Sequence, residues 1–364
     1  MIPRSSTGRR SMLPLANLVG RLGGLTAVLV GLTLCAIIQQ QVSGDFPVPA
    51  TRRQGVDTRP PQAAKVSRPV TATSLIRQVR ATVNEQRATL VRRAFGIQDV
   101  PRTNVRLVRI DRAGGWAFGT YAVPPPAGMD AMPHSSLFVA RRSGKTWRIT
   151  LAGTGEFTRL VRRAPVTVIP EDQRPFLERY DRATAESGNT SAGLALPWRA
   201  GQSWTVRSMA DLSGLRFAGG DGRVLASGAG RLYRLCARSP RRGMLLLIHP
   251  DGMVSEYYQV ADVPDLEDGA LVEQGEYLGR ISTDRPCGGP AARGRAAAIF
   301  TLLSGEHALS LEGTRIGGWT LHTAEGRFYA DRSGLRVGSG DPLLNFGPDS
   351  AVPASTSHPS GRLA

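Results

Sequence analysis

The chain has 364 residues and 41% hydrophobic content, which is enough to bury more than one core and excludes a single small domain. The formal net charge of +17 is unevenly spread, because residues 1–193 carry 28 basic and 12 acidic side chains whereas 194–346 carry 17 and 16. Since the basic excess lies in the first half and no reader motif with interleaved aromatic residues occurs, we expect no nucleic-acid partner.

An apolar segment near the N-terminus predicts export. Four arginines, at positions 4, 9, 10 and 21, precede Leu22–Ile38, an uncharged stretch of 17 residues. This length fits a short transmembrane anchor or a long signal segment. The basic residues ahead of it place residues 1–21 in the cytoplasm and the bulk of the chain outside. We therefore expect a single-pass protein of the cell membrane, held through 22–38, with a secreted protein as the alternative.

The next stretch, 39–71, is rich in Pro, Arg, Gln and Ser and predicts a disordered linker. After it, apolar residues at helical spacing predict a helix over Ser74–Phe95. Four short alternating runs then predict antiparallel strands separated by Gly and Pro turns. These runs begin at Val105, Trp116, Ser136 and Trp147.

Two further helices are predicted over Gly155–Arg163 and Glu171–Ala183, the second with an acidic first turn that suits the helix dipole. One helix before an antiparallel meander makes a small α+β accessory domain over 72–184, with a cystatin-like arrangement as one option. The only histidine of this domain, His134, follows a proline in a loop, and we interpret it as a bystander.

A small, polar linker over 185–192 leads into a Gly-rich region of short β runs over 193–347, and the remaining residues, 348–364, predict a disordered tail. Turn signals recur as in an all-β barrel or sandwich. Gly269 and Gly275 lie six apart in a hairpin typical of barrel-sandwich hybrid domains. Lipoyl and biotinyl carriers share this hairpin but need a lysine, and this region has none.

Several pieces of the second half come in one order along about 150 residues. They are Leu196-Pro-Trp-Arg-Ala-Gly-Gln-Ser-Trp204, Phe217-Ala-Gly-Gly-Asp-Gly-Arg-Val224, Glu256-Tyr-Tyr258, the double-Gly hairpin, Cys287-Gly-Gly289, Phe300-Thr-Leu-Leu303 and Ile316-Gly-Gly-Trp-Thr320. The series resembles the β-sheet domain of lysostaphin-type and staphylolysin-like zinc metallopeptidases. The resemblance implies a duplicated hybrid motif with a groove over its sheet.

The family's zinc and catalytic residues are all substituted. The resemblance implies a metal-binding Asp where this chain has Arg216, and an arginine repels Zn²⁺. The catalytic His of the Tyr-Tyr-His-Leu motif is Gln259, which cannot shuttle a proton near neutral pH. The two imidazoles of the His-x-His strand are replaced by Ala297 and Ile299. We therefore predict a degenerate family member with no intact catalytic residue, no metal ligand set and no cofactor.

Other histidines leave one alternative open. His249, His307 and His322 are scattered, without the paired spacing of a metal site, and we interpret them as surface residues. A zinc site built from relocated ligands would make the chain an active endopeptidase that cleaves peptidoglycan cross-links.

Three cysteines are too few for a disulfide scaffold. Cys35 lies in the apolar segment, which leaves Cys236 and Cys287 as one candidate pair in an exported chain. Both lie in segments that match the family, so we expect this disulfide to staple the domain.

The leading hypothesis is a catalytically inactive metallopeptidase homologue exposed outside the membrane. It would bind peptidoglycan or regulate a cell-wall enzyme through the old groove, with Tyr257, Tyr258, Gln259 and Trp319 as candidate groove residues. Besides the active zinc enzyme, a third possibility is an interaction or regulatory protein that acts through the accessory domain.

Overall fold

A computed structural model describes residues 72–111, 115–183, 193–209, 213–239, 241–292, 294–324 and 326–347 of the chain. All of these belong to one compact unit, Ser67–Ala364. The predicted segments 1–21, 22–38, 39–71, 185–192 and 348–364 lie outside the described residues. Among the helices of the described part, none is both long enough and apolar enough to span a bilayer.

The first helix, α2 (Ala72–Phe95), confirms the predicted helix and begins two residues before it. Its buried side chains include Leu75, Val79 and Val83, which recur every four residues and therefore share one face. This face packs on a sheet, together with Tyr121 and Phe138 of two of its strands.

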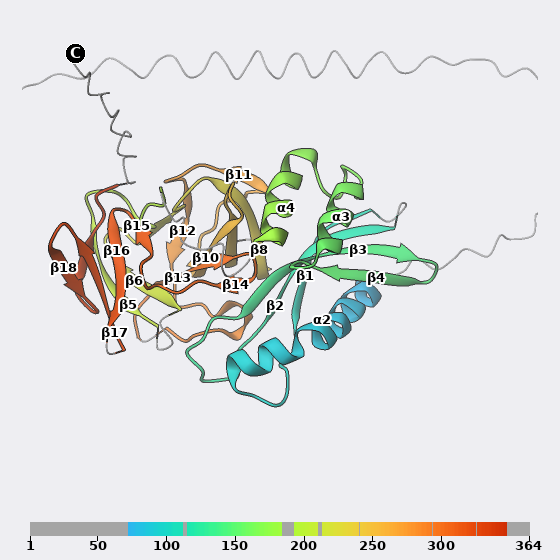
Figure 1. Ribbon diagram of the computed structural model, residues 1–364, viewed down its shortest axis with the longest axis horizontal. Coiled ribbons are helices and arrows are strands. Elements are labelled where there is room, and N and C mark those ends of the chain that lie inside the picture. The colour runs from blue at the N-terminus through green and yellow to red at the C-terminus, as the bar shows by residue number, and fades with distance from the viewer. Residues whose placement is uncertain are drawn as a thin grey trace, which may run out of the picture. The chain divides into compact units, whose positions relative to one another are not determined.

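That sheet is a four-stranded antiparallel meander in the order β1-β2-β3-β4 (Figure 1). Its strands are β1 (Asn104–Asp111), β2 (Trp116–Val123), β3 (His134–Ser143) and β4 (Thr146–Leu151). Every residue of β2 is buried, because α2 covers one face of the sheet and helices and strands of the rest of the chain cover the other. The predicted strands are confirmed.

The meander leads into a pair of short helices that pack on the face opposite α2. The first, α3 (Gly155–Arg163), has the predicted bounds. The second predicted helix begins as a 3-10 turn, η2 (Glu171–Gln173), and continues as α4 (Arg174–Arg182). A proline, Pro175, stands in the first turn of α4, where its missing N–H costs no helical hydrogen bond.

The second half is built on an eleven-stranded antiparallel sheet in the order β11-β8-β9-β10-β13-β6-β5-β19, with β12 paired to β10 and β7, and β14 to β13. Its strands are β5 (Ser203–Ser208), β6 (Gly214–Gly219), β7 (Arg223–Leu225), β8 (Gly230–Ser239), β9 (Arg242–Ile248), β10 (Met253–Ala261), β11 (Ala270–Val272), β12 (Tyr277–Ile281), β13 (Ala298–Ser304), β14 (His307–Ala308) and β19 (Pro342–Leu344). A 3-10 turn, η4 (Pro286–Gly288), precedes β13.

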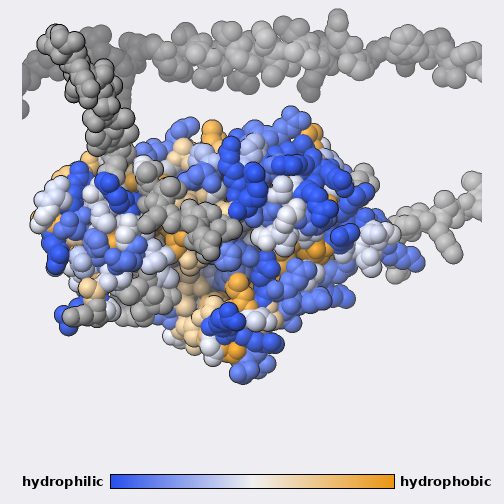
Figure 2. Space-filling model, viewed as in Figure 1, coloured by the Kyte–Doolittle hydropathy of each residue, from blue (hydrophilic) through white to orange (hydrophobic). Residues whose placement is uncertain are grey.

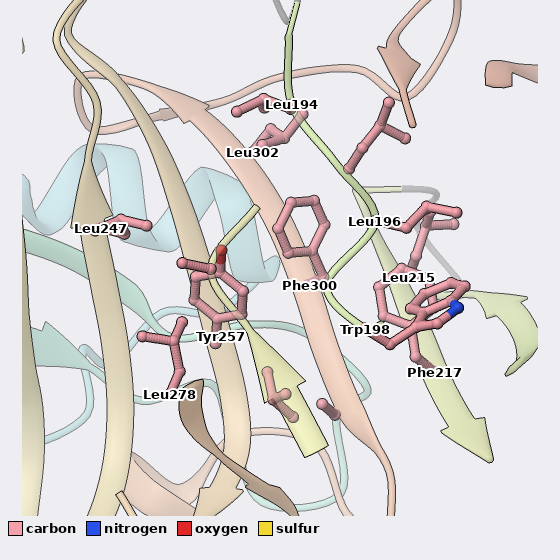
Figure 3. Packing of buried hydrophobic residues seen from close by; sticks show 14 of the residues in the cluster. Leu194, Leu196, Trp198, Leu215, Phe217, Leu247, Tyr257, Leu278, Phe300 and Leu302 are labelled. Carbon is pink, nitrogen blue, oxygen red and sulfur yellow. The ribbon is translucent and has the colours of Figure 1, made fainter. Parts of the chain in front are cut away.

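A separate four-stranded sheet completes the second half. It consists of β15 (Arg315–Ile316), β16 (Trp319–Ala324), β17 (Arg327–Arg332) and β18 (Leu335–Gly338). Trp319 and Phe328 of this sheet join a core with Trp198, Phe217 and residues of the large sheet. Figure 3 shows part of this core, in which Tyr257 lies beside Phe300. The described chain is thus mostly β-sheet, as predicted.

A second core joins the two halves of the chain. It contains Phe118 and Leu137 of the meander, Tyr180 of α4, and Leu246 and Ile299 of the large sheet. The meander and its two short helices therefore cover one face of the large sheet, and the two predicted domains share buried side chains in the described structure.

Candidate functional site

The strand framework brings the substituted positions together. In the register of the large sheet, Ile299 of β13 lies opposite Arg216 of β6 on one side and Tyr258 of β10 on the other. Ala297 forms an isolated bridge with Ser282 just before β13. Because side chains alternate along a strand, Ala297 and Ile299 share one face. This face is the one covered by the meander and the short helices, since Ile299 belongs to the shared core.

Arg216 occupies a buried position on this face and is held by three groups. Its Nη2 atom lies 2.9 Å from Oδ1 of Asp130, which comes from the loop between β2 and β3. Its Nη1 atom donates to Oε1 of Gln259 at 3.3 Å and to the carbonyl of Ala291 at 3.4 Å. The guanidinium therefore has a counter-charge supplied by the accessory segment of the same chain.

Gln259 lies next to Arg216 because the backbone of β10 is irregular there. Its φ angle is +63°, and the pairing of β10 with β9 shifts register between Tyr257 and Val260. The amide accepts from Arg216 through Oε1 and donates through Nε2 to the carbonyl of Pro290 at 3.2 Å. Both sides of this amide are thus used inside the protein.

The loop around Gly288 closes over the site. The structure confirms the predicted disulfide, which joins Cys236 of β8 to Cys287 of η4 and so fixes the start of this loop. At Gly289 an added Cβ would come within 2.8 Å of the ring and hydroxyl oxygen of Tyr258. The approach is close enough to require glycine, and it leaves Tyr258 fully buried.

These residues do not fit a zinc ion. Zinc takes imidazole, thiolate or carboxylate ligands, and Ala297 and Ile299 offer none of these. The guanidinium of Arg216 is a permanent cation and repels the metal. Across the residues that the structure describes, no group of three or more His, Cys, Asp or Glu side chains could hold a metal elsewhere.

The predicted groove is not open in this structure, which corrects the prediction for its four residues. Tyr257, Tyr258, Gln259 and Trp319 are all completely buried. The hydroxyl of Tyr257 accepts from the backbone N–H of Ser227, and the indole N–H of Trp319 donates to the carbonyl of Leu344. The covering meander and the 286–291 loop account for the closure on the side of Tyr258 and Gln259.

The three histidines of residues 193–347 do not contact the substituted positions. His249 is buried, contrary to the expectation of a surface residue, because its ring nitrogens bind the carbonyl of Ala229 and the hydroxyl of Ser255. Burial lowers its pKa. The Nδ1 atom of His322 lies 3.1 Å from Oε1 of Glu312. His307 is half-buried at the start of β14.

An open pocket of about 390 Å³ lies elsewhere in the second half, between the segment after Gly193 and the turn that joins β11 to β12. Its polar lining includes Arg199, Arg223, Gln274 and Tyr277. The guanidinium of Arg223 lies 4.6 Å from the centre of the Tyr277 ring. This pocket combines the ring of Tyr277 with the guanidinium groups of Arg199 and Arg223, which solvent can reach.

Sequence reasoning missed two features of the site. Asp130 is 86 positions from Arg216, in a loop without any motif, so no local pattern marks it as a partner. The pocket beside Tyr277 depends on four separate segments, and only the double-Gly segment was recognisable.

The sequence matches no protein-family model and no curated protein. Solved structures that resemble the chain include pseudoalterin, an M23 metalloprotease from the deep sea, at 22% identity and a TM-score of 0.37, over 43% of this chain and 99% of that one. Csd3 of Helicobacter pylori is 9% identical with a TM-score of 0.26, and the match covers 57% of this chain and 73% of that one. Lysostaphin is 14% identical with a TM-score of 0.24, and the match covers 43% of this chain and 81% of that one. These neighbours include peptidases of the type that the sequence resembles. Because the identities and TM-scores are low, function rests on the residues themselves.

Proposed function

We propose that the chain is a catalytically inactive homologue of lysostaphin-type peptidases that acts outside the membrane, by binding peptidoglycan or regulating a cell-wall hydrolase. The observation that carries the proposal is the position of Arg216, buried on the sheet face and paired with Asp130. A cation held where the family places a metal ligand excludes a divalent ion by its charge. Location outside the membrane is inferred from the apolar segment 22–38.

A wall ligand needs an open surface, and the pocket beside Tyr277 supports this part of the proposal. Aromatic faces with a few convergent polar groups suit sugar rings and short peptides. The guanidinium of Arg223, stacked on the ring of Tyr277, offers a flat surface together with a cation for an anionic group. The amide of Gln274 donates to the carbonyls of Gly193 and Ser227, which holds the pocket wall in place.

The proposal is tested by co-sedimentation of the full chain with purified sacculi. We expect the wild-type chain to pellet without releasing soluble fragments, and the variant Arg223→Ala/Tyr277→Ala to pellet several times less. The matched control is Arg336→Ala/Tyr329→Ala, which removes another arginine stacked on a tyrosine, at 4.4 Å, outside this pocket. Equal loss in both double variants, or no binding by the wild type, would contradict a wall-binding role for the pocket.

A further inference from the structure

A second pocket, of about 370 Å³, lies where the end of α2, the start of β3 and the turn between β13 and β14 meet. Its lining includes the exposed residues Ala94 and Ala308. The buried side chains of Phe95 and Leu303 form an apolar part of its wall. In Figure 2, hydrophilic side chains cover most of the visible face, with apolar patches among them. The pocket shares none of its lining with the substituted site or with the pocket beside Tyr277.

A buried carboxyl lines this pocket without a counter-charge. Glu256 of β10 is 1% exposed, and its two oxygens accept from the hydroxyls of Ser135 and Thr301, the second at 3.0 Å. Among the described residues, neither Arg nor Lys nor His forms an ion pair with it. An ionised carboxylate in such a place is costly unless a cation joins it. Glu256 must therefore either hold a proton or be joined by a positive group, and in its ionised form it can receive one.

A second polar atom in the pocket is also unused. The Nε2 atom of His134 is buried and makes no hydrogen bond. Burial, with smaller contributions from Arg87 and His307, lowers the pKa of His134 to about 4, so the ring is neutral at physiological pH. In the tautomer that carries its proton on Nδ1, the neutral ring presents Nε2 as a hydrogen-bond acceptor.

The other acid of the pocket is already paired. Glu306 lies 2.9 Å from Nη2 of Arg87, which projects from α2. The guanidinium also donates to the carbonyl of Ala152. Glu306 therefore neutralises Arg87, and the negative charge available to a ligand is that of Glu256.

We propose that this pocket binds a primary alkylammonium group, with Glu256 as its anionic partner and His134 as a further acceptor. An ammonium has three donors, which the carboxylate, the imidazole nitrogen and one hydroxyl or water can accept, whereas a guanidinium has five and would leave some unsatisfied. A short aliphatic chain behind the ammonium would lie against Phe95 and Leu303. An anion is excluded by the charge of Glu256.

The experiment is isothermal titration of the full chain with n-pentylamine at pH 8, with 1-pentanol as the uncharged counterpart. We expect saturable binding of the amine and none of the alcohol. Glu256→Gln keeps the shape and the two hydroxyl partners and should weaken amine binding at least tenfold. The matched control Glu273→Gln, an exposed acid outside the pocket, should bind as the wild type does.

A second variant tests whether loss of binding comes from the pocket rather than from misfolding of the Glu256 variant. Ala131→Trp places bulk in the pocket lining, leaves Glu256 intact and should also abolish binding. Nα-acetyl-lysine amide as a second probe distinguishes a peptide side chain from a free amine as the natural source. Absence of saturable amine binding, equal binding of the alcohol, or unchanged affinity in either pocket variant would overturn the proposal.

Discussion

Arg216 changes the electrostatics of the sheet face on which a lysostaphin-type peptidase would hold its metal. Its charge is balanced by Asp130, which lies outside its own strand, and its Nη1 atom donates to Gln259 and to the carbonyl of Ala291. The side chain of Arg216 is 10% exposed and that of Asp130 22%. A pair buried to this degree is expensive to break from one side, because the remaining charge stays desolvated.

Asp130→Ala is therefore expected to destabilise the protein. The guanidinium would keep its burial and lose its counter-charge, and we expect a loss of about 1–3 kcal/mol in urea denaturation. The control is Asp284→Ala, whose partner Arg242 is 65% exposed and 3.3 Å away. That surface pair should contribute less than about 1 kcal/mol. Equal effects of the two substitutions would contradict the structural role of the Arg216–Asp130 pair.

Glu256 gives stability a specific dependence on pH. Burial raises its pKa from 4.5 to about 7, against smaller opposing contributions from Ser135 and Thr301. The folded state then holds a proton that the unfolded state releases, so stability is full below pH 4.5 and falls as pH rises through 7. Other titratable or charged groups around this pocket are His134, His307 and the Arg87–Glu306 pair, which stay unchanged in a substitution at Glu256.

Glu256→Gln should therefore match the wild type in unfolding free energy near pH 5 and exceed it by roughly 1–3 kcal/mol at pH 8. Urea denaturation at the two pH values measures the difference. A difference that is the same at both, or that is larger at pH 5, would show that Glu256 is not protonated in the folded protein at low pH.

At the scale of single elements, much of the fold follows from the sequence. Periodic apolar residues place α2, and alternation places the meander, because each of these patterns is local. The sequence-based prediction fails at β10. All residues of this strand up to Val260 are buried, and both of its faces are covered. Alternation then no longer marks an open face. For this reason Tyr257 and Tyr258 look like groove residues in the sequence and are core residues in the structure.

The 286–291 loop is the element on which closure of the site depends. Its anchor is the Cys236–Cys287 disulfide, which spans 51 positions. Replacing both cysteines by serine should cost about 2–4 kcal/mol of stability, since a loop of this length is constrained in the unfolded chain. Thermal denaturation of the double variant measures the cost. A melting temperature equal to that of the wild type would contradict a stabilising role for the disulfide.

At the scale of the whole molecule, the accessory segment and the second half each have a core of their own and share a further core between them. No sequence pattern could predict this, because the contacts join residues far apart across the predicted linker 185–192. The consequence is cooperative unfolding. Calorimetry should give a single transition for the described part of the chain, with equal calorimetric and van't Hoff enthalpies. Two resolved transitions would indicate independent domains.

The absence of metal chemistry is the central claim, and metal analysis combined with a peptidoglycan cleavage assay tests it most directly. The full chain is purified in metal-free buffer, supplied with zinc, freed of excess metal and added to purified sacculi. Because Arg216, Gln259, Ala297 and Ile299 offer no ligand set, we predict substoichiometric zinc and no release of soluble fragments. One zinc per chain together with cleavage that a chelator abolishes would contradict the account.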